Sequence, residues 1–171
     1  MQSESARVTT AQESRYRVQY PNSKRRSVKV IALDPPSADM IDELAKKDWN
    51  GATFFRALSF ASDAEPGKTD AGLSAWLNDL AGRALDLVSE VESSDFIVVV
   101  SAAGEDARSI SVIADACTAH HKTLLALVVP GEDASDADVT ASMGHLRPYA
   151  RMLVIAHDAD YITAMLTALR A

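Results

Sequence analysis

The chain of 171 residues has a single cysteine, Cys117, so no disulfide can close within it. Small apolar residues surround this cysteine, which favours a buried thiol over a zinc ligand. No apolar run approaches the ~20 residues that a bilayer-spanning helix needs, and the N-terminus lacks the apolar segment of a signal peptide. We therefore expect no membrane span and a cytoplasmic location.

Glycine is also scarce, with seven residues in the chain. Phosphate-binding loops are rich in glycine because their backbone amides must approach the phosphate oxygens closely at a helix N-terminus. The loop "DPPS" instead contains Pro35 and Pro36, which have no amide hydrogen, and Asp34, whose charge opposes a phosphate. No GxxxxGK[ST] sequence is present either. These absences argue against a dinucleotide or Walker-type site.

The charge is distributed unevenly along the chain. Net charge is −7, but residues 1–27 hold six basic and two acidic residues, which leaves 11 basic and 22 acidic residues in the remainder. An acidic body argues against nucleic-acid binding, which needs clustered positive charge. We expect residues 1–27 to form a flexible basic arm, which is either simply solvated or in contact with an acidic partner, a membrane surface or nucleic acid. The basic residues concerned are Arg15, Arg17, Lys24, Arg25 and Arg26.

Within this arm, Tyr16, Val18 and Tyr20 alternate with polar residues. Such alternation is typical of a strand with one buried face. The arm could therefore also add an edge strand to a sheet.

From residue 28 onward, apolar runs alternate with helical patterns. Continuous apolar runs such as "DFIVVV" predict strands that are buried on both faces. Apolar residues at three- and four-residue spacing predict helices, including a long one over 73–92. The predicted strands cover 27–33, 51–60, 95–102, 123–130 and 151–158, and the other predicted helices cover about 38–47, 106–121, 135–147 and 161–170, with Ser37 capping the first of these.

This order predicts a single Rossmann-like α/β domain over residues 28–171. We expect a three-layer sandwich whose five-stranded, mainly parallel sheet has helices on both faces. The strand order should be of the type 2-1-3-4-5 or 3-2-1-4-5. In such sheets, ligands bind beyond the carboxyl ends of the strands.

The loops at those carboxyl ends contain the candidate ligand-binding residues, to none of which we assign a metal or a catalytic role. Hydroxyl groups and one glycine in the third loop could hold a phosphate, whereas Glu105 and Asp106 would oppose it and suit an ordinary helix start. The candidates are Asp34, Ser37, Ser101, Gly104, Ser109, His157 and Asp158.

The cluster "AHDAD" after the last predicted strand allows two interpretations. His157 and Asp158 could pair as a base and its orienting carboxylate, or hold a metal. Alternatively, Asp158 or Asp160 caps the last helix while His157 lies at the surface.

The stretch from "VESSDFIVVVSAAGEDARSISVIADACTAHHKTLLALVVPG" to "ASMGHLRPYARMLVIAHDADYI" resembles the nucleotide-binding half of the FtsZ/tubulin family. The resemblance extends over about residues 28–171 and implies a nucleotide-binding fold. That family's glycine-rich loops would fall on 33–39 and 102–109, where Gly104 alone remains. The resemblance also implies that one family strand is lost between Ser59 and Gly72.

Two hypotheses of function follow. In the first, the chain is a non-catalytic binding or scaffolding module that docks on a protein partner or self-associates, has lost GTP hydrolysis and needs no cofactor. In the second, it is an enzyme or sensor for a nucleotide or phosphate ligand, held at the carboxyl ends of the first, third and fifth strands. The missing glycines favour the first.

Overall fold

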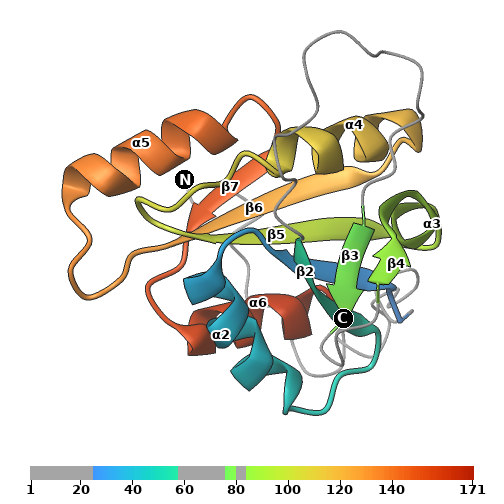
Figure 1. The fold of residues 1–171 in the computed structure, drawn as a ribbon. Coiled ribbons are helices and arrows are strands. Elements are labelled where there is room, and N and C mark those ends of the chain that lie inside the picture. The colour runs from blue at the N-terminus through green and yellow to red at the C-terminus, as the bar shows by residue number, and fades with distance from the viewer. Residues whose placement is uncertain (1–24, 58–75, 80–83) are drawn as a thin grey trace, which may run out of the picture.

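The computed structural model describes residues 25–57, 76–79 and 84–171, which contain seven strands and five helices (Figure 1). The strands are β1 (Val28–Ala32), β2 (Ala52–Ala57), β3 (Trp76–Asp79), β4 (Ala84–Asp86), β5 (Phe96–Ala102), β6 (Thr123–Val129) and β7 (Met152–Ile155). The helices are α2 (Pro35–Ala45), α3 (Leu87–Glu92), α4 (Ile110–Ala119), α5 (Asp136–Leu146) and α6 (Ala159–Ala168).

All seven strands form one sheet, in the order β4-β3-β2-β1-β5-β6-β7. β1, β2, β5, β6 and β7 are parallel, β3 is antiparallel to β2, and β4 is antiparallel to β3. The α/β class with a parallel sheet is confirmed. The expected count of five strands is too small, because two short antiparallel strands extend the sheet beyond β2. Neither expected five-strand order therefore describes the whole sheet.

The prediction of one long helix over 73–92 is wrong in the described part of that segment. Trp76–Asp79 and Ala84–Asp86 are strands, and the helix covers only Leu87–Glu92. Asp86 begins this helix because its carboxylate accepts a hydrogen bond from the Ser89 amide at 3.0 Å. Over a few residues, the spacing of apolar side chains is compatible with both a helix and a strand. Here the segment pairs with β2 and forms a strand.

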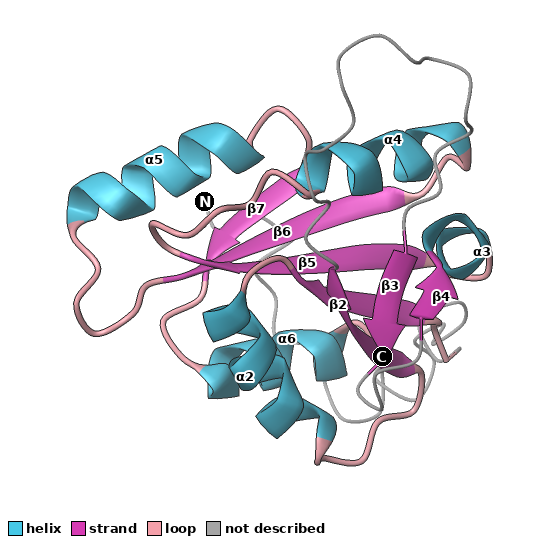
Figure 2. Cartoon of the chain, viewed as in Figure 1, coloured by secondary structure: helices cyan, strands magenta, loops and turns pink. Residues whose placement is uncertain are grey.

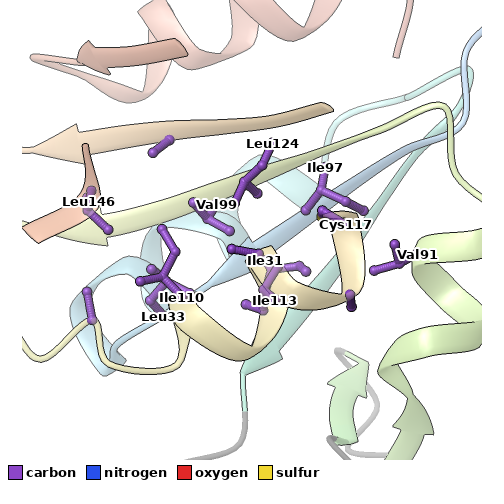
Figure 3. Packing of buried hydrophobic residues seen from close by; sticks show 14 of the residues in the cluster. Ile31, Leu33, Val91, Ile97, Val99, Ile110, Ile113, Cys117, Leu124 and Leu146 are labelled. Atoms are coloured by element: carbon purple, nitrogen blue, oxygen red, sulfur yellow. The ribbon is translucent and has the colours of Figure 1, made fainter. Parts of the chain in front are cut away.

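The helices pack on both faces of the sheet (Figure 2). Along β5, Phe96, Val98 and Val100 contribute to a core with α2 and α6, while Ile97 and Val99 contribute to a core with α3, α4 and α5. Figure 3 shows the second core, in which Ile110 and Ile113 of α4 lie against β1 and β5. Burial on both faces explains why these strands lack alternation in the sequence.

Residues 25–27 of the expected arm lie against the domain. The Arg26 amide donates to the Arg170 carbonyl at 3.0 Å, and Ser27 exchanges two hydrogen bonds with Asp95. A side chain at Gly51 would collide with the Arg26 carbonyl, so glycine permits this close approach. Residues 1–24, including Tyr16, Val18 and Tyr20, lie outside the described residues. The proposed edge strand in the arm therefore stays a prediction.

Two helices end with a residue other than glycine in the left-handed region. His121 follows α4 with φ 54°, and its amide and that of Lys122 donate to the Thr118 and Cys117 carbonyls. This is a Schellman motif, in which glycine usually takes the left-handed position because a Cβ is unfavourable there. Arg170 takes the same position after α6, with φ 64°.

The His121→Gly substitution should therefore stabilise the protein by about 1 kcal/mol, because glycine removes the strain of the left-handed backbone. Urea unfolding followed by circular dichroism measures the change. The neighbouring His120→Gly is the matched control: His120 has φ −101°, so glycine there should only add chain entropy and destabilise. Equal effects of the two substitutions would contradict this account.

Within residues 25–57, 76–79 and 84–171, no helix combines the length and the apolar character that crossing a membrane requires.

Candidate functional site

A cavity of about 470 Å³ lies at the carboxyl ends of β1, β2 and β5. This is the edge of the sheet at which the sequence predicts ligand binding. The loop after β1 and the entry to α2 form one wall, Arg56 and Ala57 of β2 a second, and the loop between β5 and α4 a third. Of the candidate residues, Asp34 and Ser109 line this cavity.

Asp34 is 7% exposed, and both oxygens of its carboxylate accept backbone hydrogen bonds. Oδ1 accepts from the Ser37 amide at 2.8 Å, which makes Asp34 the N-cap of α2. Oδ2 accepts from the Ala102 amide at 2.9 Å, at the end of β5. The carboxylate thus connects the start of α2 to the end of β5. A phosphate oxygen bound at this position would accept hydrogen bonds from the same two amides.

The expectation that Ser37 caps a helix starting near Ala38 is wrong by three residues. α2 begins at Pro35, because proline needs no hydrogen-bond partner at the first helical positions. Ser37 lies at the third helical position, where its hydroxyl donates to the Asp34 carbonyl at 3.0 Å and accepts from the Asp34 amide at 3.3 Å. It is 1% exposed and closes a capping box with Asp34.

Two candidates of the third loop do not line the main cavity. Ser101 is fully buried, and its hydroxyl contacts the Ala102 carbonyl at 3.3 Å. Gly104 has φ 85°, which a side chain rarely tolerates, and its amide donates to the Ser142 hydroxyl of α5 at 2.9 Å. It borders a separate cavity of about 210 Å³ that His145 also lines.

Ser109 and Arg56 each place a buried polar atom without a partner next to the main cavity. The Ser109 hydroxyl oxygen and the Arg56 Nε are both buried and have no hydrogen bond among the described residues. Ser109 is the N-cap of α4, but its side chain caps no amide. Sequence reasoning selected Ser109 and missed Arg56. An arginine within the apolar run "ATFFRA" was the signal available.

The lining of the cavity is rich in carboxylates. Asp39 and Glu105 are exposed at its rim, and Asp106 forms an ion pair with Arg108 at 2.6 Å. The hydrogen bonds from Arg108 lower the pKa of the Asp106 carboxyl, so this side chain is charged at neutral pH. Arg56 is paired with Asp42. Both arginines of the cavity therefore already have acidic partners.

The last loop confirms the helix-cap interpretation of "AHDAD". The Asp158 carboxylate accepts the Tyr161 amide at 2.6 Å and begins α6, and His157 is exposed. Neither residue lines the main cavity. In the part of the chain that the structure describes, no three His, Cys, Asp or Glu residues gather to hold a metal.

Cys117 is 2% exposed, as its apolar neighbours in the sequence predict. Burial raises the pKa of its thiol to about 12. The thiolate, which is the reactive form, is therefore absent at neutral pH.

A second cavity, of about 660 Å³, lies at the opposite end of the sheet, beside the amino ends of β5, β6 and β7. Its polar residues include Arg25, Arg26, Arg151 and Asp95. Its apolar wall consists of Phe96, Leu125, Met152 and Leu169. Arg25 and Arg26, which belong to the basic arm expected from the sequence, thus line the same cavity as Arg151, about 125 residues later in the chain. Sequence reasoning missed Arg151.

Comparison with known proteins gives no matching family model and no significant match among curated proteins.

Proposed function

We propose that this chain is a non-catalytic, Rossmann-like binding module that docks on a protein partner and does not hydrolyse GTP. One observation carries the proposal: the Asp34 carboxylate accepts hydrogen bonds from the Ser37 and Ala102 amides, at 2.8 and 2.9 Å. A phosphate at the end of β1 would need these amides. The chain supplies its own anion there instead.

The electrostatics of the cavity support the same proposal. A phosphate in it would face Asp39 and Glu105 at the rim, while Arg56 and Arg108 are already held by carboxylates. An arginine that bound a phosphate would have to give up or share its present ion pair with a carboxylate. Among the described lining residues, the cavity therefore offers a phosphate no arginine without a carboxylate partner.

In this proposal, the resemblance to the FtsZ/tubulin family reflects a shared three-layer scaffold in which the phosphate loops have been replaced. The parallel strands in the order β2-β1-β5-β6-β7 and the helices on both faces are consistent with such a scaffold. Function then belongs to a surface other than the former nucleotide site. The cavity with Arg25, Arg26 and Arg151 is the strongest described candidate for that surface.

A second function is favoured by the Ser109 hydroxyl oxygen and the Arg56 Nε, which have no hydrogen-bond partner in the described part of the chain. Buried polar atoms usually have partners, and a small polar ligand in the cavity would supply them. Under this alternative the chain is a sensor or enzyme for a small ligand at the carboxyl ends of β1, β2 and β5.

Thermal melting with GTP, GDP, NAD and inorganic phosphate separates the two functions. A ligand at a hundred times its Kd stabilises a protein by about 2.7 kcal/mol, or roughly 5–10 °C for a chain of this size. We expect no change in Tm with any of these compounds. A rise in Tm that disappears in Ser109→Ala would refute the proposal and establish the ligand site.

A further inference from the structure

The edge of the sheet at β7 carries features of a peptide-binding site, and the inference drawn from them rests on the proposed function. β7 is the last strand of the sheet among the described residues and pairs with β6. The Ala156 amide donates to the Val128 carbonyl of β6 at 2.8 Å. Because successive residues of a strand direct their backbone groups to alternate sides, Leu153 and Ile155 direct theirs away from β6. A further strand could bond to these groups.

Apolar surface accompanies this edge. Met152 is 54% exposed, the largest value among the large apolar residues that the structure describes. Together with Leu125 and Leu169, it forms part of the apolar wall of the 660 Å³ cavity. An exposed apolar side chain and an apolar cavity wall, next to a strand that no other described strand covers, suit the binding of an extended segment.

Positive charge lies at the amino end of β7 and in the cavity next to it. Arg151 directly precedes β7, and Arg25 and Arg26 line the cavity with it. Asp95 is the sole acidic residue of the described lining, and its carboxylate accepts the Ser27 amide at 2.7 Å. The surface therefore attracts carboxylates, although the body of the protein is strongly acidic.

We propose that β7 binds an extended, acidic and apolar segment of a protein partner by strand addition. The backbone of the segment pairs with Leu153 and Ile155, its apolar side chains lie against Met152, and its carboxylates contact Arg25, Arg26 and Arg151. Two other occupants would bring positive charge to this positively charged surface, and like charges repel. Residues 14–20 of the chain itself carry Arg15 and Arg17, and a second copy of β7 would bring its own Arg151.

The probe is a short fluorescein-labelled peptide that alternates glutamate and leucine, added to the full chain and followed by fluorescence anisotropy. We expect binding that weakens with added salt and that is at least about tenfold weaker in Arg151→Glu. Arg108→Glu is the matched control, since it makes the same charge change at the opposite end of the sheet and should not alter the affinity. Equal binding by a peptide with lysine in place of glutamate would overturn the proposal.

Strand addition has its own test. Hydrogen exchange at the Leu153 and Ile155 amides should slow when the peptide binds. Ile155→Pro should keep the fold, because proline is tolerated on an edge strand where its missing amide faces outward, and should abolish peptide binding. Unchanged peptide affinity in a folded Ile155→Pro variant would overturn strand addition.

Three other outcomes would also overturn the proposal. The first is protection of these amides without peptide that is lost in Val18→Pro, which would assign the edge to the arm. The second is protection that rises with protein concentration together with dimer formation, which would assign it to a second copy. The third is binding to phosphatidylserine vesicles but not to the peptide. None of these outcomes involves the cavity at the carboxyl ends of β1, β2 and β5. Failure of the strand-addition proposal can therefore be distinguished from failure of the proposed function, which a nucleotide-dependent rise in Tm would show.

Discussion

Replacing Asp34 by alanine should lower the free energy of unfolding by about 2–4 kcal/mol. Loss of an N-cap costs about 0.5–2 kcal/mol. Alanine would also leave the Ala102 amide without its acceptor, and a backbone group deprived of its partner costs about 1–3 kcal/mol. Because Asp34 is 7% exposed, water cannot easily replace the carboxylate. Urea unfolding monitored by circular dichroism measures the loss.

Asp158→Ala is the matched control. Asp158 caps α6 through one hydrogen bond to the Tyr161 amide, and it is exposed. Its loss should therefore cost only about 1 kcal/mol, the ordinary value of an N-cap. If both alanine variants lose the same stability, Asp34 is merely a cap, and its bond to Ala102 contributes nothing. The central observation of the proposed function would then lose its energetic support.

Removing the carboxylate of Glu90 should destabilise the protein by about 2–3 kcal/mol. Lys29 lies in the central strand β1 and is 9% exposed, and its ammonium contacts Glu90 Oε2 at 2.8 Å. It also lies 5.5 Å from the centre of the Phe55 ring. Breaking a buried pair leaves one charge without compensation, which costs about 3–5 kcal/mol when burial is complete. We expect a smaller loss because the Glu90 side chain is 21% exposed.

The double variant Lys29→Met with Glu90→Ala should recover most of this stability, because no charge then stays buried. A double-mutant cycle, measured by urea unfolding, gives the coupling between the two residues. The pair Lys46 and Glu43 is the control: their contact is 2.5 Å, but both side chains are more than two-thirds exposed. Its coupling should be about 0.3–0.5 kcal/mol. Similar coupling for the two pairs would show that burial is not what makes Lys29 depend on Glu90.

The parallel part of the fold could be read from the sequence because its signals are local and strong. Phe96–Val100 is apolar without alternation, and Val28–Ala32 is apolar except for Lys29; such runs are typical of strands that are buried on both faces. Strands β3 and β4 could not be read in this way. Their apolar residues also satisfy helical spacing, and the choice depends on the free edge of β2, which lies about 20 residues earlier in the chain.

The candidate site was predictable in its location but not in its interactions. The carboxyl ends of parallel strands lie at the same edge of a sheet. The prediction that both strands belong to one parallel sheet therefore also placed the end of β1 near the loop after β5. The sequence also indicated that Asp34 would oppose a phosphate. It contained no sign that this carboxylate would bond to the Ala102 amide, 68 residues later.

The amino-acid sequence by itself determined the α/β class, the buried thiol and the absence of glycine-rich phosphate loops, since each depends on residue types within a short stretch. Only the tertiary structure decided what takes the place of those loops. It also decided that Arg151 lines the same cavity as Arg25 and Arg26, next to a strand that forms the edge of the sheet among the described residues. Contacts between distant segments depend on strand order and register, and neither is encoded in any single stretch of the chain.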